Sequence, residues 1–305
     1  MLLFKKKGDN MKKDKTCLFC KKRIVILSII LVFLLLVFLL FKLWQKHNTE
    51  KFQIPVLMYH NIVLDEKFNN QPDTVSVTMF DEQMKYLYDN NYKTLSMQEF
   101  YCWKIGNCSI PEKSVLLTFD DGFYGIYYLG EPILKKYNFV ASAFLIGSTI
   151  NETTNDYNPN KYGTIGLDVV NSDKNSFEYY SHSYGMHKEI DGKKMIYRLS
   201  NKELDDDAKK MKEILHAEYI SYPFNTDTDS FIKILKNNGY KLAFRGESEK
   251  ATIDVNNYQI PRIGVKNDIN QFKNIFETKE HNNRYGNGLL RKIFITLERK
   301  FNVKF

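Results

Sequence analysis

The sequence predicts an α/β fold, a β/α barrel preceded by one N-terminal transmembrane helix. From residue 51 onward, short apolar or β-branched runs alternate with longer amphipathic segments, which is typical of β/α repetition. Several of the short runs end in Asp or His, as expected where strands meet at the rim of a barrel. The chain of 305 residues is long enough for one barrel, roughly 250 residues, and an appendage.

An apolar segment near the N-terminus predicts the anchor. Ile24 to Phe41 is apolar except for Ser28, and a helix of that length, at about 1.5 Å per residue, nearly crosses a hydrocarbon core of about 30 Å. The positive-inside rule predicts a cytoplasmic N-terminus and an extracytoplasmic large domain, because nine basic residues precede the segment: Lys5, Lys6, Lys7, Lys12, Lys13, Lys15, Lys21, Lys22 and Arg23. We therefore expect a cytoplasmic basic segment (1–23), a transmembrane anchor (24–41) and a linker (42–53).

A cleaved signal peptide is the alternative interpretation of this segment. Residues 42–46 (Lys-Leu-Trp-Gln-Lys) follow the apolar run and offer no small-x-small cleavage site. The sequence therefore favours an uncleaved anchor.

The charge distribution argues against a nucleic-acid partner. The formal net charge is +8, but residues 1–50 hold 11 Lys or Arg and only 3 Asp or Glu. The rest of the chain holds 33 of each sign, so the large domain is neutral. Residues 51–305 therefore have no excess of basic residues with which to bind a phosphate backbone.

Two pairs of cysteines stand on opposite sides of the predicted membrane. Cys17 and Cys20 lie on the cytoplasmic flank, where a single CxxC lacks the second ligand pair of a structural zinc site. Cys102 and Cys108 lie outside and are close enough in sequence for a small disulfide loop. Their spacing leaves that disulfide open, because it does not establish the required geometry.

Seven short runs are candidate strands of the domain that we place at 54–280. They are Ile54–Tyr59, Val115–Phe119, Ala141–Ile146, Phe177–Tyr180, Tyr219–Tyr222, Lys241–Phe244 and Ile260–Ile263. Between them, Thr78 is expected to cap a helix with one apolar face, formed by Phe80, Met84 and Leu87. Asp227 is expected to cap a second helix, which ends at Gly239. The Asn- and Thr-rich stretch Asn151–Tyr162 reads as a long surface loop beside the site.

Three of these strands end in residues that can do chemistry. Val115–Phe119 continues into Asp120 and Asp121, Phe177–Tyr180 leads to His182, and Ile54–Tyr59 leads to His60. Adjacent carboxylates at a buried strand end would repel each other unless a cation or another partner offsets the cost. Consecutive strand residues point in opposite directions, so one carboxylate could bind a metal while the other faces water or substrate. A solvated turn or a helix cap is the alternative interpretation of Asp-Asp-Gly.

His182 and His187 complete a candidate metal site with Asp121. A catalytic zinc site needs about three nitrogen or oxygen ligands from the protein and one open position. The spacing of five residues disfavours one helical face, whereas a strand end followed by a loop could bring both imidazoles to one ion. We expect one divalent ion, with Zn²⁺ as the default, although Fe, Co, Ni or Mn accept the same ligands.

These residues resemble the motifs of the polysaccharide deacetylases with NodB homology, carbohydrate esterase family 4. Thr118–Gly122 (TFDDG) is similar to the first motif of the family and Ser181–His187 (SHSYGMH) to its histidine motif. The resemblance covers most of residues 54–264 and implies a distorted (β/α)7-type barrel. Four further segments resemble the poly-β-1,6-N-acetylglucosamine deacetylase branch: Val56–His60, Pro132–Tyr137, Ser221–Phe224 and Ile260–Ile263.

The resemblance also implies roles for individual residues. Asp120 would be the catalytic base and His60 the general acid, while Asp121, His182 and His187 would bind the metal. Three aromatic residues are the expected contacts with substrate, with a backbone N–H near the last of them for the oxyanion: Tyr184, Tyr222 and Phe224.

Two departures from the family pattern concern the tuning of the site. Many relatives carry an arginine before the Pro-aromatic motif that orients the catalytic carboxylate, but Ile220, Ser221 and Tyr222 occupy this region here. The pattern ahead of the histidine motif is also altered, around Leu167 and Asp168.

The resemblance implies a membrane-anchored, extracytoplasmic, metal-dependent N-deacetylase of a cell-surface N-acetylglucosamine polymer. Poly-β-1,6-N-acetylglucosamine is the expected substrate, with a role in biofilm or cell-surface polysaccharide and with polysaccharide synthase machinery as a further partner. A deacetylase of peptidoglycan or another glycan is the first alternative. A catalytically silent glycan-binding barrel is the second.

The C-terminal segment 281–305 predicts an amphipathic basic helix. Leu289, Leu290, Ile293, Phe294, Leu297 and Phe301 recur at helical spacing, with Lys and Arg among them. Docking on the domain and binding to anionic lipid are the two interpretations.

Overall fold

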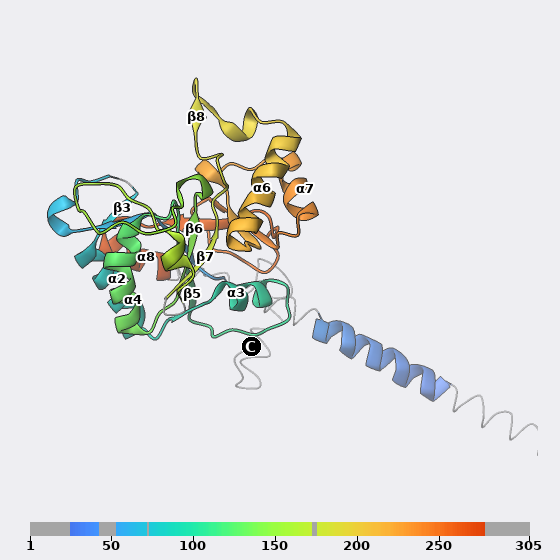
Figure 1. Ribbon diagram of the computed structural model, residues 1–305. Coiled ribbons are helices and arrows are strands. Elements are labelled where there is room, and N and C mark those ends of the chain that lie inside the picture. Colours follow the sequence, from blue (N-terminus) through green and yellow to red (C-terminus); the bar gives the residue numbers. More distant parts are fainter. Residues whose placement is uncertain (1–24, 43–52, 72, 173–175, 278–305) are drawn as a thin grey trace, which may run out of the picture. The chain divides into compact units, whose positions relative to one another are not determined.

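The computed structural model describes residues 25–42, 53–71, 73–172 and 176–277, in two compact units that divide after Phe52 (Figure 1). The first unit contains the helix Val25–Lys42, the one helix among the described residues that is long and apolar enough to cross a membrane. A signal sequence passes the same test, so the finding fits both interpretations of this segment.

Some of the expectations fall on residues outside this description. They are the basic segment 1–23, most of the linker 42–53, the Cys17 and Cys20 pair, and the C-terminal helix 281–305.

Seven parallel strands close into a barrel in the second unit. Their order is β1-β12-β11-β10-β7-β6-β5, and β1 pairs with β5 to complete the ring. The strands are β1 (Val56–Tyr59), β5 (Ser114–Phe119), β6 (Ala141–Leu145), β7 (Phe177–Ser181), β10 (Tyr219–Ser221), β11 (Leu242–Gly246) and β12 (Ile260–Gly264).

All seven predicted strands are confirmed, each within two residues at either end. Barrel strands are covered on both faces, so they read as continuous apolar runs; all six residues of β5 are buried. Five further strands were not predicted. Each is only two or three residues long, which is too short to show an alternation of apolar and polar residues. They are β2 (Asn61–Val63), β3 (Thr74–Ser76), β4 (Lys93–Thr94), β8 (Glu189–Ile190) and β9 (Lys193–Lys194).

Helices fill most of the connections between barrel strands (Figure 1). They are α2 (Val77–Asp89), α3 (Met97–Lys104), α4 (Glu131–Tyr137), α5 (Leu167–Val170), α6 (Asn201–Leu215), α7 (Asp229–Asn237) and α8 (Ile269–Phe276). Five single-turn helices lie between them: η1 (Asp65–Lys67), η2 (Ile126–Gly130), η3 (Gly147–Thr149), η4 (Met195–Tyr197) and η5 (Pro223–Asn225). The connection from β11 to β12 contains no helix, which makes the barrel irregular.

Both predicted helix caps are wrong by one or two residues. The hydroxyl of Ser76, not Thr78, accepts the N–H of Met79 at the start of α2. Thr228, not Asp227, caps α7 by accepting the N–H of Phe231. In each case the expected residue has another partner, which the sequence pattern does not reveal: Thr78 donates to Asp65, and Asp227 pairs with Arg245. The predicted apolar face of α2 is confirmed, with Phe80, Met84 and Leu87 buried.

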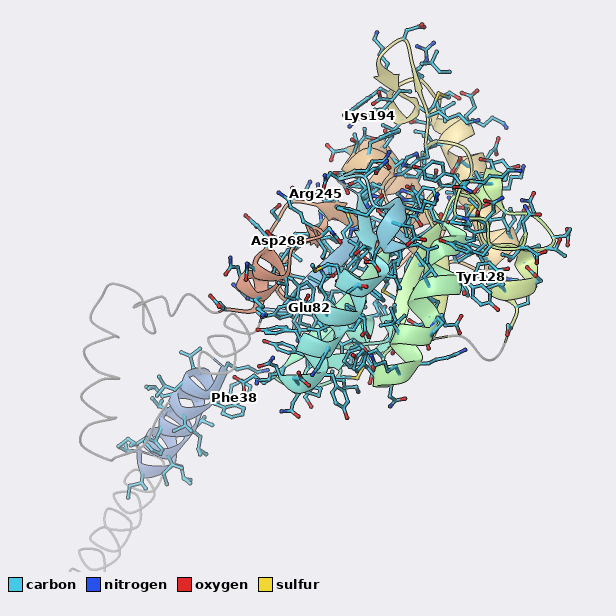
Figure 2. The ribbon with its side chains drawn as sticks, turned by 90° about the vertical axis from the view of Figure 1, so that its left-hand side faces the viewer. Phe38, Glu82, Tyr128, Lys194, Arg245 and Asp268 are labelled. Carbon is cyan, nitrogen blue, oxygen red and sulfur yellow. A yellow bond between two sulfur atoms is a disulfide. The ribbon has the colours of Figure 1, made fainter. Side chains whose placement is uncertain are left out.

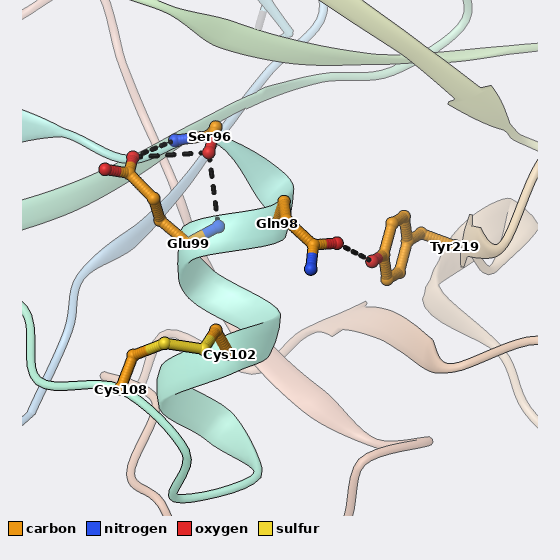
Figure 3. The surroundings of a disulfide bond; sticks show 6 residues. All are labelled: Ser96, Gln98, Glu99, Cys102, Cys108 and Tyr219. Atoms are coloured by element: carbon orange, nitrogen blue, oxygen red, sulfur yellow. Dashed lines mark hydrogen bonds between the residues drawn. A yellow bond between two sulfur atoms is a disulfide. The ribbon is translucent and has the colours of Figure 1, made fainter.

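Helix α3 packs across the amino-terminal end of the barrel. The buried Lys104 donates through Nζ to the carbonyls of Ile253 and Val255 at 2.7 and 2.6 Å, in the β11–β12 connection. Cys102 and Cys108 form the disulfide that the sequence left open, with Cα atoms 5.3 Å apart (Figure 3). Lys104 thus joins α3 to the β11–β12 connection, and the disulfide joins α3 to the loop that follows it.

Candidate metal centre and active site

Asp121, His182 and His187 converge at the carboxyl ends of β5 and β7. Oδ1 of Asp121 lies 3.4 Å from Nε2 of His182 and 3.3 Å from Nε2 of His187. The three ligand atoms lie within 4.8 Å of one another. The structure therefore brings together all three residues that the sequence predicts as metal ligands.

The surroundings of His182 fix which nitrogen faces Asp121. Nδ1 lies 2.9 Å from the carbonyl oxygen of Ser221, so we assign the ring proton to Nδ1 and a lone pair to Nε2. Burial lowers the pKa of His182, and the nearby Asp120 and Asp121 offset only part of that effect. A neutral imidazole with its free nitrogen toward Asp121 is the form that binds a metal.

The turn between the two histidines is held by α6. Asp207 accepts the backbone N–H groups of Tyr184 and Gly185, each at 2.8 Å. Burial raises the pKa of Asp207, although these two hydrogen bonds favour the carboxylate. Ser183 adopts a positive φ of 66° in the turn. Asp207 therefore fixes the path of the chain from His182 to His187.

The ring of Phe224 covers the second histidine. Its centroid lies 4.4 Å from that of His187, with 29° between the planes. Phe224 has a positive φ of 54°, which is unusual for a bulky residue. Lys194 donates to the carbonyl of Phe224 at 3.3 Å and to the hydroxyl of Thr226 at 2.7 Å. Figure 2 shows Lys194 on the side of the domain that carries the β8–β9 hairpin.

Asp120 faces the inside of the barrel, where it meets a residue that the sequence analysis did not identify as functional. Nη1 and Nη2 of Arg262 donate to its two carboxylate oxygens, both at 2.7 Å. Arg262 is fully buried on β12, and Nη2 also donates to Ser221 at 2.7 Å. The sequence does contain one indication of this role: Arg262 lies in the otherwise apolar run Ile260–Ile263, and a charged residue inside a barrel strand requires a buried partner.

This contact supplies the guanidinium that the family pattern places elsewhere. The expected position before the Pro-aromatic motif holds Ser221, whose hydroxyl also bonds Asp120, at 3.2 Å. Burial alone would raise the pKa of Asp120, but Arg262 and His182 outweigh it and hold that pKa well below its ordinary value. Asp120 is therefore ionised at neutral pH.

Backbone geometry separates the two neighbouring carboxylates. Asp121 has a φ of 70°, a left-handed conformation that turns its side chain away from the barrel interior. Gly122 follows at φ 74°, and a Cβ there would meet Cδ2 of Leu145 at 2.6 Å. The chain thus directs Asp120 to Arg262 and Asp121 to the two histidines. The sequence predicted separate directions for the pair, but not Arg262 as the partner of Asp120.

His60 borders the same cavity as Asp121. A cavity of about 380 Å³ is lined by His60, Asn61, Gln71, Asp73, Thr74, Asp121, Phe123 and Tyr162. Nδ1 of His60 lies 4.0 Å from Oδ1 of Asp73, and the His60 side chain retains 19% of its exposure. An imidazole and a metal-ligand carboxylate therefore open into one space.

The three predicted aromatic contacts have different environments. The side chain of Tyr222 is fully buried and its hydroxyl donates to the carbonyl of Tyr258. The ring of Tyr184 packs against Lys210, whose Nζ lies 3.5 Å from the ring centroid, on the α6 side. Phe224 alone lies directly on a predicted metal ligand.

The three ligand atoms fit a divalent cation. Oδ1 of Asp121 is buried and has no hydrogen-bond partner within the described residues, and it faces two imidazole nitrogens. Buried oxygens without a partner are costly, and a cation would satisfy all three lone pairs. One carboxylate and two imidazoles also match the ligand set of mononuclear catalytic sites.

Comparisons with known proteins show the family to which the chain belongs. The family model for polysaccharide deacetylases matches residues 109–243. The poly-β-1,6-N-acetyl-D-glucosamine N-deacetylase of Staphylococcus epidermidis is 30% identical over 242 residues, which cover 73% of this chain and 83% of that protein.

Two solved structures share the fold at lower identity. The Streptococcus pyogenes deacetylase PplD has a TM-score of 0.62 and 24% identity, over 75% of this chain and 98% of that one. IcaB from Ammonifex degensii has a TM-score of 0.61 and 21% identity, and the match covers 74% of this chain and 96% of that one. They confirm the predicted (β/α)7-type barrel. Together with the identity to the Staphylococcus epidermidis protein, the barrel and its motifs place the chain in the polysaccharide deacetylase family, as an enzyme.

Proposed function

We propose that the chain is a membrane-anchored, extracytoplasmic, metal-dependent N-deacetylase of poly-β-1,6-N-acetylglucosamine. One observation carries the proposal: Asp121, His182 and His187 point at one spot beside an ionised Asp120. The cavity that Asp121 lines is also lined by His60, so the proposed proton donor and one of the three metal ligands border one space.

Asp121 and the two histidines would hold a single divalent ion, for which Zn²⁺ is the default. When bound, such an ion polarises the acetamide carbonyl and lowers the pKa of a water molecule. The Nδ1 contact of His182 with Ser221 and the ring of Phe224 on His187 hold the imidazoles in place for this task.

Asp120 is suited to accept a proton from the attacking water. Arg262 keeps the carboxylate ionised and fixes its plane through two hydrogen bonds. Attack of water on the acetamide carbon produces a tetrahedral oxyanion, for which the backbone N–H near Phe224 is the proposed donor.

His60 is suited to protonate the departing amine. Cleavage of the C–N bond then releases acetate and leaves a glucosamine residue on the polymer. Oδ1 of Asp73 lies 4.0 Å from Nδ1 of His60, on the border of the same cavity. The amine product is cationic at neutral pH, so the reaction changes the charge of the retained polysaccharide.

Asp120→Asn tests the assignment of the base. The amide cannot accept the proton, so we expect acetate release from β-1,6-linked N-acetylglucosamine oligomers to fall by about 10²- to 10⁴-fold. The variant should still bind Zn²⁺, measured by chelator competition, which controls for loss of the fold. Removing metal with EDTA should abolish release in the unaltered chain and Zn²⁺ should restore it. Full activity of the Asp120→Asn variant would refute the mechanism.

The linkage of the substrate is tested with the same assay. The Staphylococcus epidermidis relative supports β-1,6-linked oligomers as the better substrate. A higher kcat/KM on β-1,4-linked oligomers would instead favour a deacetylase of peptidoglycan or a related glycan. Specific binding without any acetate release, in the presence of metal, would favour a glycan-binding barrel.

A further inference from the structure

A second cavity adjoins the one that His60 and Asp121 line. Its volume is about 190 Å³, and it shares four lining residues with the larger cavity: Asn61, Gln71, Thr74 and Tyr162. The two hollows therefore lie side by side along one groove. The volume of the larger cavity lies near the lower end of the usual range for a small ligand, ~300–1,000 Å³. A polysaccharide bound there would therefore extend into the smaller cavity.

The walls of the smaller cavity are held together by polar contacts. One wall is the stretch from β2 to β3, and the other is the segment 157–162 of the loop predicted to flank the site. Lys67 donates to Oδ1 of Asn160 at 2.6 Å, and the hydroxyl of Tyr162 donates to Oε1 of Gln71 at 3.1 Å.

The floor fixes the position of the second wall. The buried Tyr124 has its hydroxyl 2.6 Å from the carbonyl of Asn158 and 2.7 Å from that of Lys161. A Cβ at Gly125 would lie 2.3 Å from the carbonyl oxygen of Ile62, so glycine permits the close approach of β2. The groove is thus formed in advance of binding.

The lining suits a sugar. Tyr162 is 69% exposed, and its ring lies 5.9 Å from that of Phe123, which lines the larger cavity. Tyr162 lines both cavities and Phe123 lines the larger one, so each cavity has an aromatic ring on which a sugar ring can pack. Side-chain amides also line the smaller cavity and can bond hydroxyl and acetamide groups: Asn61, Asn69, Gln71, Asn158 and Asn160.

The charges of the lining discriminate between the two forms of that sugar. Lys67 and Lys161 line the smaller cavity, and no carboxylate does so among the described residues. Asp73 lines only the larger cavity, beside His60. An ammonium group on a deacetylated sugar would therefore meet two like charges and no counter-ion.

We propose that the smaller cavity is a subsite for the sugar next to the reacting one, and that it accepts this neighbour as the neutral N-acetylated form rather than the cationic amine. The proposal rests on the proposed glycan deacetylase function. It implies that a newly formed glucosamine disfavours reaction of the residue beside it. The product would then be a polymer with spaced, not contiguous, amines.

The stacking part is tested with Tyr162→Ala in the full chain, in detergent. Tyr197→Ala is the matched control, because Tyr197 is 63% exposed on η4 and does not line either cavity. We expect the gain in kcat/KM from monomer to pentamer of N-acetylglucosamine to fall by about three- to tenfold in Tyr162→Ala and to stay unchanged in Tyr197→Ala. In an Asp120→Asn background, Tyr162→Ala should also weaken binding of the pentamer and Tyr197→Ala should not, which separates binding from chemistry.

The charge part is tested with defined dimers and trimers whose reacting sugar has either an acetylated or an amine neighbour. The unaltered chain should prefer the acetylated neighbour, and Lys161→Glu should reduce that preference. Equal rates on both substrates, or equal effects of Tyr162→Ala and Tyr197→Ala, would overturn the subsite while leaving the deacetylase intact. No acetate release from any oligomer with metal present would overturn the proposed function and the subsite with it.

Discussion

At the scale of single residues, Arg262 decides how Asp120 behaves. It contacts both carboxylate oxygens from β12, while the family pattern expects an arginine near Ser221 on β10. The two strands are separated only by β11 in the barrel, so a side chain from either can reach the same interior point. Position in space, not position in sequence, is what a buried ion pair requires.

Arg262→Lys should impair chemistry more than substrate binding. Lysine keeps the charge but loses the two-pronged geometry, so the plane of Asp120 is no longer fixed. We expect kcat to fall roughly tenfold to a hundredfold with little change in KM. Arg245→Lys, which alters the more exposed pair with Asp227, is the control. A kcat unchanged in Arg262→Lys would show that Asp120 needs no such partner.

Asp207→Asn should weaken metal binding without touching a ligand. The N–H groups of Tyr184 and Gly185 bond to separate oxygens of Asp207, and an asparagine amide replaces one of these oxygens with an NH2 donor, so one of the two hydrogen bonds is lost. We expect the Kd for Zn²⁺ to rise about 10- to 100-fold, measured by chelator competition. Asp206→Asn, on an exposed pair with Lys202 in the same helix, should leave it unchanged. Equal Kd values for the two variants would exclude this positioning role.

At the scale of elements, one buried carboxylate joins α3 to the barrel. Glu178 on β7 accepts the N–H of Met97, the first residue of α3, at 2.7 Å and the hydroxyl of Ser142 at 3.3 Å. The helix dipole favours a carboxylate at this end. Burial has the opposite and larger effect, and it raises the pKa of Glu178 above its ordinary value of 4.5.

The raised pKa predicts a definite pH dependence for this contact. The folded state binds the proton of Glu178 more tightly than the unfolded state, so the contribution to stability is fully present below pH 4.5 and is lost as the pH rises through the folded pKa. Glu178→Gln mimics the protonated form. Urea unfolding from pH 4 to 7 should show the variant gaining stability over the unaltered chain as the pH rises. Glu82→Gln, exposed on α2, should show no such trend.

At the scale of the whole molecule, the helix Val25–Lys42 raises the question of where the enzyme works, because a retained anchor and a cleaved signal peptide give different locations. If it is retained, the full-length mass should be found in the membrane fraction, and external protease should digest the large domain of intact protoplasts but spare a tag at Met1. Deleting residues 24–41 should release the protein to the soluble fraction. A mature chain that begins shortly after Phe41 would identify the segment as a cleaved signal peptide.

The sequence by itself determined the barrel, its seven strands and the three residues that form the candidate metal site. Strands buried on both faces need long apolar runs, and the rim residues follow those runs directly, so both signals are local. The tertiary structure alone decided the partner of Asp120, the burial of Tyr222 and the groove between β2–β3 and the 157–162 segment. Each of these depends on contacts between residues that lie far apart in the sequence. Closure of the barrel and the paths of its loops bring these residues together, and loops have no regular hydrophobic pattern from which a path could be predicted.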